Sequence, residues 1–358
     1  HKMSKRLDFY DVIKGVAIFM VVMGHIITMC IRDIDSAFIF KIIGQSHIPL
    51  FFFVSGFFTY KALKDPQGNI AEEFLQPALF KRIKQLLVPT IAVGALWLWY
   101  FPHSGLQSPL DSTVSGMLLS PWKNGYWFPL VLFLVFVIYY VFSILAGVLR
   151  STVNIITTAI LVWVLIIVGA NALDEKLCDL FSLRLVAQFY PIFMVGVFAR
   201  RHESLFYKAV ENGYVQTVAI LTGAVAFYVS AYYWEFPYIP EDALMLISLV
   251  YCTCLSLVAV AMAKKFTEAY TESRIKNVIT LLGRKSLEIY LLHYFFLFPM
   301  TGLQATMLNL GLGFTPLFIT SALAAAIVIA LVLAVNEVIS LSPILSTVLT
   351  GNYSQRKK

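Results

Sequence analysis

The hydrophobic residues of the chain are gathered into separated runs, with polar and charged residues concentrated between them. A helix needs about 20 apolar residues to cross the hydrocarbon core of a bilayer, and the runs here are about 17–25 residues long. They predict membrane spans near residues 10–31, 42–60, 84–101, 127–149, 152–170, 185–199, 213–233, 241–263, 286–300 and 314–338. The predicted fold is therefore all-α, a polytopic membrane helix bundle of about ten transmembrane helices.

The basic residues are distributed unevenly over the predicted loops. If the N-terminus lies in the cytoplasm, 22 of the 27 Lys and Arg residues fall in loops and helix ends on the cytoplasmic side. Cytoplasmic loops of membrane proteins carry such an excess. Both termini are therefore predicted to be cytoplasmic. The net charge of +7 then reflects orientation in the bilayer, and no nucleic-acid partner is expected.

Composition supports a single membrane domain. The chain is 59% hydrophobic and 13% charged, with a mean hydropathy of +0.79, whereas soluble domains are about 45–50% apolar and about 25% charged. His1 and Lys2 precede Met3 and are interpreted as the remnant of an expression tag. One transmembrane domain is thus expected over residues 3–358. The four cysteines are too few and too scattered to predict a disulfide framework.

Charged and ionisable residues within the predicted spans are the first candidates for chemistry, because each costs about 2.5–3.5 kcal/mol to insert. In the first span, Asp11, Lys14, Ile18, Val22 and His25 are spaced by three or four residues and share one helix face. Lys14 and His25 lie about 16 Å apart along that face. The structural alternative is that Lys14 reaches the inner headgroups and His25 bonds a neighbouring helix.

Further polar residues lie in the second and ninth spans. His47 lies near the outer end of the second span and is either a site residue or an interfacial side chain. Ser55-Gly56 is more typical of close helix packing than of a nucleophile. The ninth span holds Glu288 and His293, and Glu288 is a candidate partner for Arg284 or Lys285.

A short basic run, Lys81-Arg82-Ile83-Lys84, precedes Pro89 at the inner end of the third span. Its default interpretation is an anchor on the cytoplasmic side. Arginine also bonds phosphate oxygens through two parallel N–H groups, so the run suits a phosphate-rich ligand that enters from the cytoplasm.

Taken in order, these motifs resemble the acyltransferase 3 family of integral membrane O-acyltransferases, and in particular its fucose 4-O-acetylase-like branch. The resemblance rests on Lys14 with His25, on the segments 47–57 and 80–89, on Tyr126-Trp127-Phe128, on Tyr190 to Arg201, and on Gly283 to His293. It covers most of the chain. One departure is Lys14, where much of the family has arginine, which lessens a bidentate grip on phosphate.

The resemblance implies transfer of an acyl group from cytoplasmic acetyl-CoA to a sugar hydroxyl on a surface polysaccharide or a lipid-linked glycan. A longer acyl group such as succinyl is an alternative. It also implies a multi-pass protein of the bacterial inner membrane, with an acyl-CoA, a sugar-containing acceptor and the lipid bilayer as partners and no metal. The oligomeric state is left open.

Roles for the candidate residues follow from this chemistry. A neutral imidazole can take the proton of an attacking hydroxyl, which makes His25 the candidate general base. His47, Tyr126 and Trp127 are the candidates for stabilising the oxyanion. Lys14, Arg82, Lys81 and Ser55 are assigned to the acyl-CoA. Direct transfer is favoured over an acyl-enzyme, for which Ser55 and Ser286 are the available nucleophiles.

Two other classes of protein remain. A transporter or flippase for a glycan or lipid would also carry intramembrane polar residues, but transporters tend to have helices broken near the midplane. The first span is predicted to be unbroken from Lys14 to His25, which favours the enzyme. In a membrane scaffold without chemistry, Lys14 and His25 would be dispensable.

Overall fold

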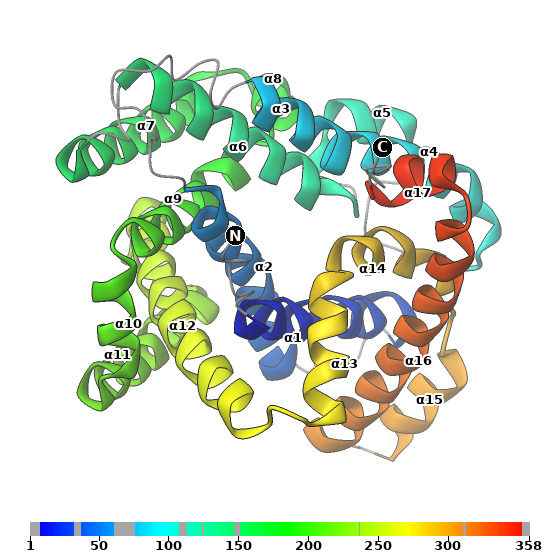
Figure 1. Ribbon diagram of the computed structural model, residues 1–358. Helices are drawn as coiled ribbons and strands as arrows, with labels where there is room; N and C mark the ends of the chain where they lie inside the picture. Colours follow the sequence, from blue (N-terminus) through cyan, green and yellow to red (C-terminus); the bar gives the residue numbers. More distant parts are fainter. Residues whose placement is uncertain are drawn as a thin grey trace.

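The computed structural model describes residues 8–31, 37–60, 76–106, 113–123, 125–146, 151–235, 237–310 and 313–352. Within these residues the secondary structure is helical throughout, as the sequence predicts. The longer helices are α1 (Asp8–His25), α2 (Ala37–Thr59), α4 (Val88–Tyr100), α6 (Trp127–Ala146), α7 (Thr152–Ala172), α9 (Leu183–Arg201), α11 (Gly213–Ala231), α12 (Glu241–Ala269), α13 (Arg274–Arg284) and α16 (Phe314–Ser340). Figure 1 shows them as a bundle with α1 near its centre.

Short helices connect and cover these elements. They are α3 (Gln76–Arg82), α5 (Val114–Leu119), α8 (Glu175–Leu180), α10 (Glu203–Glu211), α14 (Ser286–Leu292), α15 (Thr301–Asn309) and α17 (Pro343–Thr350). Within α1–α16, eight stretches of the described chain are long and apolar enough to cross a membrane. They coincide with eight of the predicted spans. A ninth predicted span, 127–149, corresponds to α6, whose apolar part is shorter.

The predicted span 286–300 differs from the structure, which breaks this segment. Helix α14 ends at Leu292, a 3-10 turn covers His293–Phe296, and residues 297–300 are not helical. The segment nevertheless follows α1 from end to end. A Cβ on Gly283 would touch the Asp11 carbonyl, and the Met300 N–H donates to the Cys30 carbonyl at 2.9 Å. Hydropathy predicted the path correctly and the continuous helix wrongly.

Helix α1 is the most enclosed element of the described bundle. It packs against α2, α12, α13, α14 and α16, and most of its side chains are buried. A helix that is apolar on nearly all sides is typical of a bundle core. Any polar side chain on α1 must therefore find its partners among these neighbours.

Small residues set how closely the helices approach. A Cβ on Gly56 of α2 would meet the Phe193 carbonyl of α9, and a Cβ on Gly196 of α9 would meet the Phe53 carbonyl. Without side chains at these two points, the backbones make van der Waals contact, which is the main attraction between helices in lipid. The interpretation of Ser55-Gly56 as a packing site is confirmed for Gly56.

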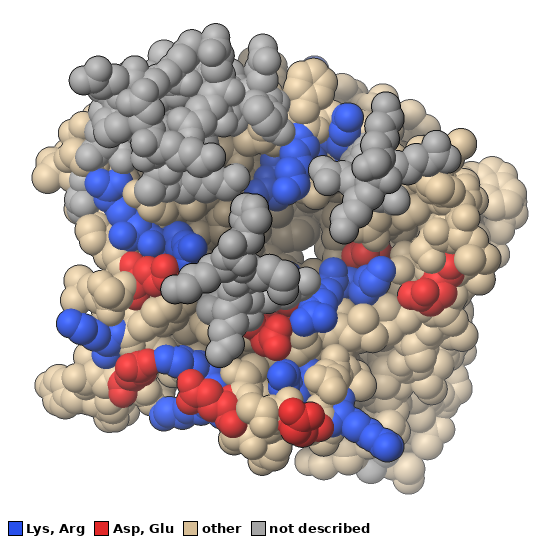
Figure 2. Space-filling view, in the orientation of Figure 1, with Lys and Arg blue, Asp and Glu red and all other residues tan. Residues whose placement is uncertain are grey.

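The two ends of the described chain lie on the same side of the bundle. Arg284 pairs with Asp8 at the start of α1, and the Asn352 side chain beyond α17 donates to Glu288 at the start of α14. On this face, Lys and Arg side chains lie on both sides of a hollow, over α3 and over the junction of α13 and α14 (Figure 2). We assign this face to the cytoplasm on the basis of the charge distribution.

Candidate active site

A cavity of about 270 Å³ opens between α1, α2, α6, α14 and the basic end of α3. Its lining includes Lys14, Ser55 and Arg82, three of the four residues assigned to the acyl-CoA. Lys81 is exposed and does not line it. Neighbouring residues on a helix point about 100° apart, and here Arg82 faces the cavity while Lys81 points to its outside.

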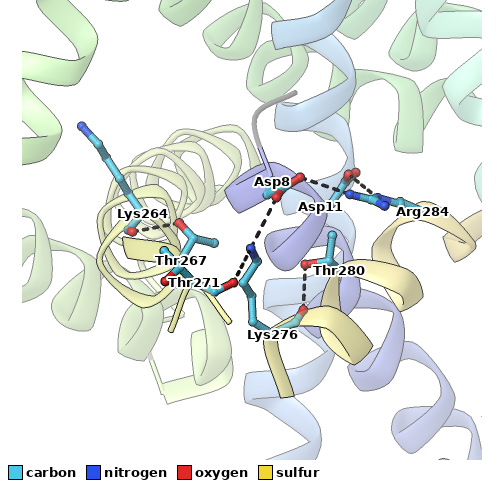
Figure 3. A network of polar contacts seen from close by, with 8 residues as sticks. All are labelled: Asp8, Asp11, Lys264, Thr267, Thr271, Lys276, Thr280 and Arg284. Carbon is cyan, nitrogen blue, oxygen red and sulfur yellow. Dashed lines mark hydrogen bonds and ion pairs between the residues drawn. The ribbon is translucent and has the colours of Figure 1, made fainter. Parts of the chain in front are cut away.

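The cations of this cavity differ in how far they are neutralised. Lys14 pairs with the buried carboxylate of Asp11 at 2.9 Å, and Arg284 reaches the same carboxylate at 3.2 Å. Figure 3 shows Arg284 between Asp11 and Asp8, with Lys276 approaching Asp8 from the far side. Lys14 is thus an ion-paired residue of the cavity wall.

Arg82 has a different environment. Its guanidinium lies 4.0 Å from the centre of the Phe136 ring, and no carboxylate lies within ion-pair distance in the part of the chain that the structure describes. A cation held against an aromatic face keeps its N–H donors for a ligand. Among the predicted donor residues, Arg82 is the best placed to bond phosphate.

A second cluster is buried deeper, at the other end of α1. His25 is half-buried, while His293 and Tyr294 of the broken segment are almost fully buried. The Nδ1 of His25 lies 3.0 Å from the Nε2 of His293, and the Nε2 of His25 lies 3.0 Å from the Tyr294 hydroxyl. The structural alternative for His25, a bond to a neighbouring segment, is therefore fulfilled, and its partners are themselves ionisable.

The end of α14 explains the position of this cluster. The last carbonyls of a helix have no intrahelical N–H partner and need another donor. The Tyr126 hydroxyl donates to the Leu291 carbonyl at 3.1 Å, and the His293 Nδ1 lies 2.8 Å from the Tyr290 carbonyl. Thus Tyr126 and His293 bond carbonyls at the buried end of α14, and the bond to the Tyr290 carbonyl fixes the His293 ring.

The hydrogen-bond network assigns a protonation pattern to the neutral cluster. A carbonyl only accepts, so the His293 Nδ1 carries a hydrogen and its Nε2 is an acceptor. The Nδ1 of His25 must then donate to His293. This leaves the Nε2 of His25 as an unprotonated nitrogen, which is the form that a general base requires.

The Tyr294 hydroxyl stands between two acceptors. It lies 3.0 Å from the Nε2 of His25 and 3.0 Å from the Gly125 carbonyl. It has one hydrogen and can donate to only one of them at a time. Rotation of the hydroxyl toward Gly125 would leave the Nε2 of His25 free to bond another hydroxyl group.

The cavity and the buried cluster meet at α14. Tyr290 lines the cavity, and its hydroxyl donates to the Gly125 carbonyl at 2.7 Å, the same carbonyl that Tyr294 reaches. Seven residues of helix, about 10 Å, separate the cavity residue Ser286 from His293. A single continuous wall thus joins the predicted phosphate site to the predicted base.

The remaining predicted site residues surround the cluster. The Tyr126 ring packs edge-on against Tyr294, with the ring centres 5.2 Å apart, and Trp127 stacks on Phe189. His47 bonds the Ile43 carbonyl of its own helix and lies within electrostatic range of His25. These three residues keep their role as predictions, although the Tyr126 hydroxyl is engaged by Leu291.

Sequence reasoning singled out His293 without assigning it a role, and it missed Tyr294 and Gly125. The signal for His293 and Tyr294 was the pair of polar rings at the end of an apolar run. Glu288 was predicted to pair with Arg284 or Lys285, and the structure shows Lys285, at 3.6 Å. Arg284 is taken by Asp8 and Asp11 instead.

Comparison with known proteins gives one match. The model of the acyltransferase 3 family, described as an acyltransferase domain, matches residues 7–335 and so covers most of the chain. The match includes α1, the broken segment and the cavity residues Lys14, Ser55 and Arg82, but not the cavity residues 350–352. No curated protein and no solved structure gives a significant match.

Proposed function

Because the chain belongs to the acyltransferase 3 family, we propose that this membrane acyltransferase uses cytoplasmic acetyl-CoA to acetylate a sugar hydroxyl. The acceptor is a surface polysaccharide or a lipid-linked glycan, as in the fucose 4-O-acetylase-like branch. The observation that supports this best is the position of the His25 ring, whose Nδ1 lies 3.0 Å from His293 and whose Nε2 lies 3.0 Å from the Tyr294 hydroxyl.

The proposed reaction is a direct transfer. The acceptor hydroxyl gives its proton to the Nε2 of His25 while its oxygen attacks the thioester carbonyl carbon. The C–S bond then breaks, and the departing thiolate takes the proton from His25. The hydrogen bond from the Nδ1 of His25 to His293 keeps the ring in the orientation that this exchange needs.

The donor is proposed to extend from the cavity toward His25. Arg82 bonds phosphate oxygens, Lys14 adds positive charge, and Ser55 contributes a polar wall. The roughly 16 Å between Lys14 and His25 along α1 resembles the reach of the pantetheine arm. The cavity opens on the basic face, where a cytoplasmic cofactor would enter.

An acyl-enzyme is the less favoured route. Ser55 and Ser286 both line the cavity, but in the described structure neither hydroxyl is hydrogen-bonded to an imidazole or a carboxylate. A serine without a neighbouring base is a poor nucleophile. Labelled acetyl retained on the protein without an acceptor would show the acyl-enzyme route.

Transport of a glycan or lipid is the second candidate, and one observation favours it. The expected absence of broken helices holds for α1 but fails for the segment with His293, which is interrupted inside the bundle. Broken segments of this kind line substrate sites in transporters. A transporter would move its substrate without adding mass to it.

The deciding experiment compares glycans from cells that express the wild type or His25→Ala at equal levels. Mass spectrometry of surface and lipid-linked glycans should show an O-acetyl increment only with the wild type. An unchanged glycan profile would reject His25 as the base and favour transport. The His202→Ala variant is a matched control, because His202 follows α9 outside both the cavity and the cluster.

A further inference from the structure

A second cavity, of about 380 Å³, lies between α2, α9, α11 and α12. Its lining includes Gln45, Gln188, Ser230 and Glu241, and it shares no residue with the cavity that holds Lys14. Ser230 is near the end of α11 and Glu241 is the first residue of α12. These helix ends are on the side of the bundle opposite the basic face, which is the outer side.

The chemistry of this cavity suits a neutral polyhydroxyl ligand. The Ser230 hydroxyl donates to the side-chain oxygen of Gln45 at 2.9 Å, so the Gln45 amide keeps its N–H donors. Gln188 adds a second amide, Glu241 adds acceptor oxygens, and Phe189 adds an aromatic wall. Amides and carboxylates that alternate with apolar rings bond sugar hydroxyls and cover sugar C–H faces.

An apolar groove of about 500 Å³ lies along three of these four helices, α2, α11 and α12. Phe38 and Ile42 of α2 line it together with Gly223 and Ala224 of α11 and Val258 of α12. The outer cavity is polar and the groove is apolar, yet they share helices. A ligand that occupies both has a polar head and a hydrocarbon chain.

One stripe of α2 connects the two spaces. Phe38, Ile42, Gln45 and Pro49 follow one another at spacings of four, three and four residues and so share a helix face, and Lys41 lies three residues from Phe38 and four from Gln45. Phe38 and Ile42 line the groove, and Gln45 and Pro49 line the cavity. The Lys41 ammonium lies 3.6 Å from the centre of the Tyr232 ring, and Tyr232 lines the groove. A positive charge thus lies beside the groove, at a point of α2 between Phe38, which lines the groove, and Gln45, which lines the cavity.

We propose that the outer cavity and the groove form the acceptor site, and that the acceptor is an anionic glycolipid. Its sugar occupies the cavity, its phosphate lies near Lys41, and its hydrocarbon chain occupies the groove. This inference rests on the proposed function and selects the lipid-linked glycan over the finished polysaccharide. The Glu241 carboxylate disfavours an ordinary phospholipid whose phosphate would enter the cavity.

The cavity also communicates with the buried cluster. Phe189 lines the cavity and stacks on Trp127, with ring centres 5.9 Å apart. Trp127 follows Tyr126, whose ring contacts Tyr294. A chain of aromatic contacts from Phe189 through Trp127 and Tyr126 therefore links the cavity to the cluster of His25, His293 and Tyr294.

The test uses the full-length protein in nanodiscs, with labelled acetyl-CoA and two forms of the same glycan. One is the lipid-linked glycan extracted from the expressing cells, and the other is that glycan after mild acid has removed its lipid phosphate. Three variants are compared with wild type. The cavity variant carries two substitutions, Gln188→Ala and Glu241→Gln, and the other two are the single substitutions Lys41→Gln and Ala224→Phe. Val225→Phe is the matched control, because Val225 lines a different space between α11 and α12 and not the groove.

We expect Lys41→Gln and Ala224→Phe to raise the KM for the lipid-linked glycan about tenfold and to leave the KM for the released glycan unchanged. The cavity variant should raise both KM values, and Val225→Phe neither. If both Lys41→Gln and Ala224→Phe keep the wild-type KM, the proposed binding of the lipid phosphate and hydrocarbon chain is wrong. If the cavity variant keeps both wild-type KM values, the whole proposed acceptor site is wrong. Failure of the proposed function is separate: wild type would then transfer no more acetyl than His25→Ala.

Discussion

Helix α1 and the broken segment 286–300 cross the bundle side by side and differ in backbone structure. Helix α1 is continuous from Asp8 to His25, whereas its neighbour from Ser286 to Met300 is divided into α14, a 3-10 turn and a non-helical stretch. A continuous helix satisfies its own carbonyls and fixes distances between side chains on one face. A helix that ends inside the protein leaves carbonyls that side chains can bond.

The difference assigns separate tasks to the two segments. Helix α1 separates the charge of Lys14 from the imidazole of His25 by three helical turns. The broken segment supplies His293, which its own Tyr290 carbonyl orients, and Tyr294. The proposed base, His25, thus sits on the continuous helix, and the groups that bond its ring come from the broken segment.

The largest effect is expected at His293. His293→Leu removes the acceptor for the Nδ1 of His25 and should lower kcat about a hundredfold, the range found for groups that orient another side chain. His293→Gln offers a side-chain oxygen in place of that acceptor and should recover part of the loss. Acetyl transfer at saturating acetyl-CoA measures both. Equal activity of the two variants would show that His293 only fills space.

Gly283→Ala should push α1 away from the end of α13, just before the broken segment begins. The added Cβ would collide with the Asp11 carbonyl, which is backbone and cannot move aside cheaply. Overpacking of this kind costs about 1–3 kcal/mol, so the variant should unfold at lower temperature and lose transfer activity. Gly302→Ala is the control, since no atom lies within 4 Å of its new Cβ. Equal thermal stability of both variants would contradict the tight contact.

Arg82→Gln should raise the dissociation constant for acetyl-CoA about tenfold, the effect of one charge-assisted hydrogen bond. Lys14→Gln should have a smaller effect, because Asp11 already neutralises part of the Lys14 charge. Lys81→Gln is the control, since Lys81 is exposed outside the cavity. Calorimetric titration of the three purified variants measures this order. A larger loss for Lys81→Gln would place the donor elsewhere.

The sequence predicted α1 well because the features that define this helix lie within its own residues. The spacing of Lys14 and His25 is a property of one helix, and the apolar run is long enough to fix that helix. The broken segment was mispredicted because residues 286–300 have the composition of a spanning helix. The Tyr126 hydroxyl, 165 positions from its acceptor Leu291, helps to stabilise the break. No local pattern contains that contact.

The same reasoning explains the partial success for the site. Lys14, Ser55 and Arg82 were assigned to one ligand, the acyl-CoA, from the family resemblance and from the basic character of Lys14 and Arg82, and the structure brings them into one cavity. Lys81 could not be separated from Arg82 in sequence, since both are basic and adjacent. Tyr294 was missed because a tyrosine among phenylalanines is ordinary in a membrane span. Its significance depends on the His25 and Gly125 atoms that it reaches.

The smallest effect is expected for Tyr294→Phe, which tests the hydroxyl that links the broken segment to α1. One neutral hydrogen bond contributes about 1 kcal/mol, so kcat should fall about fivefold with no change in acetyl-CoA affinity. Tyr290→Phe is the control, because it removes a donor to the same Gly125 carbonyl without touching His25. A loss near a thousandfold for Tyr294→Phe alone would instead make Tyr294 the oxyanion donor. The broken segment would then supply a group that touches the reacting atoms, in addition to one that orients the base.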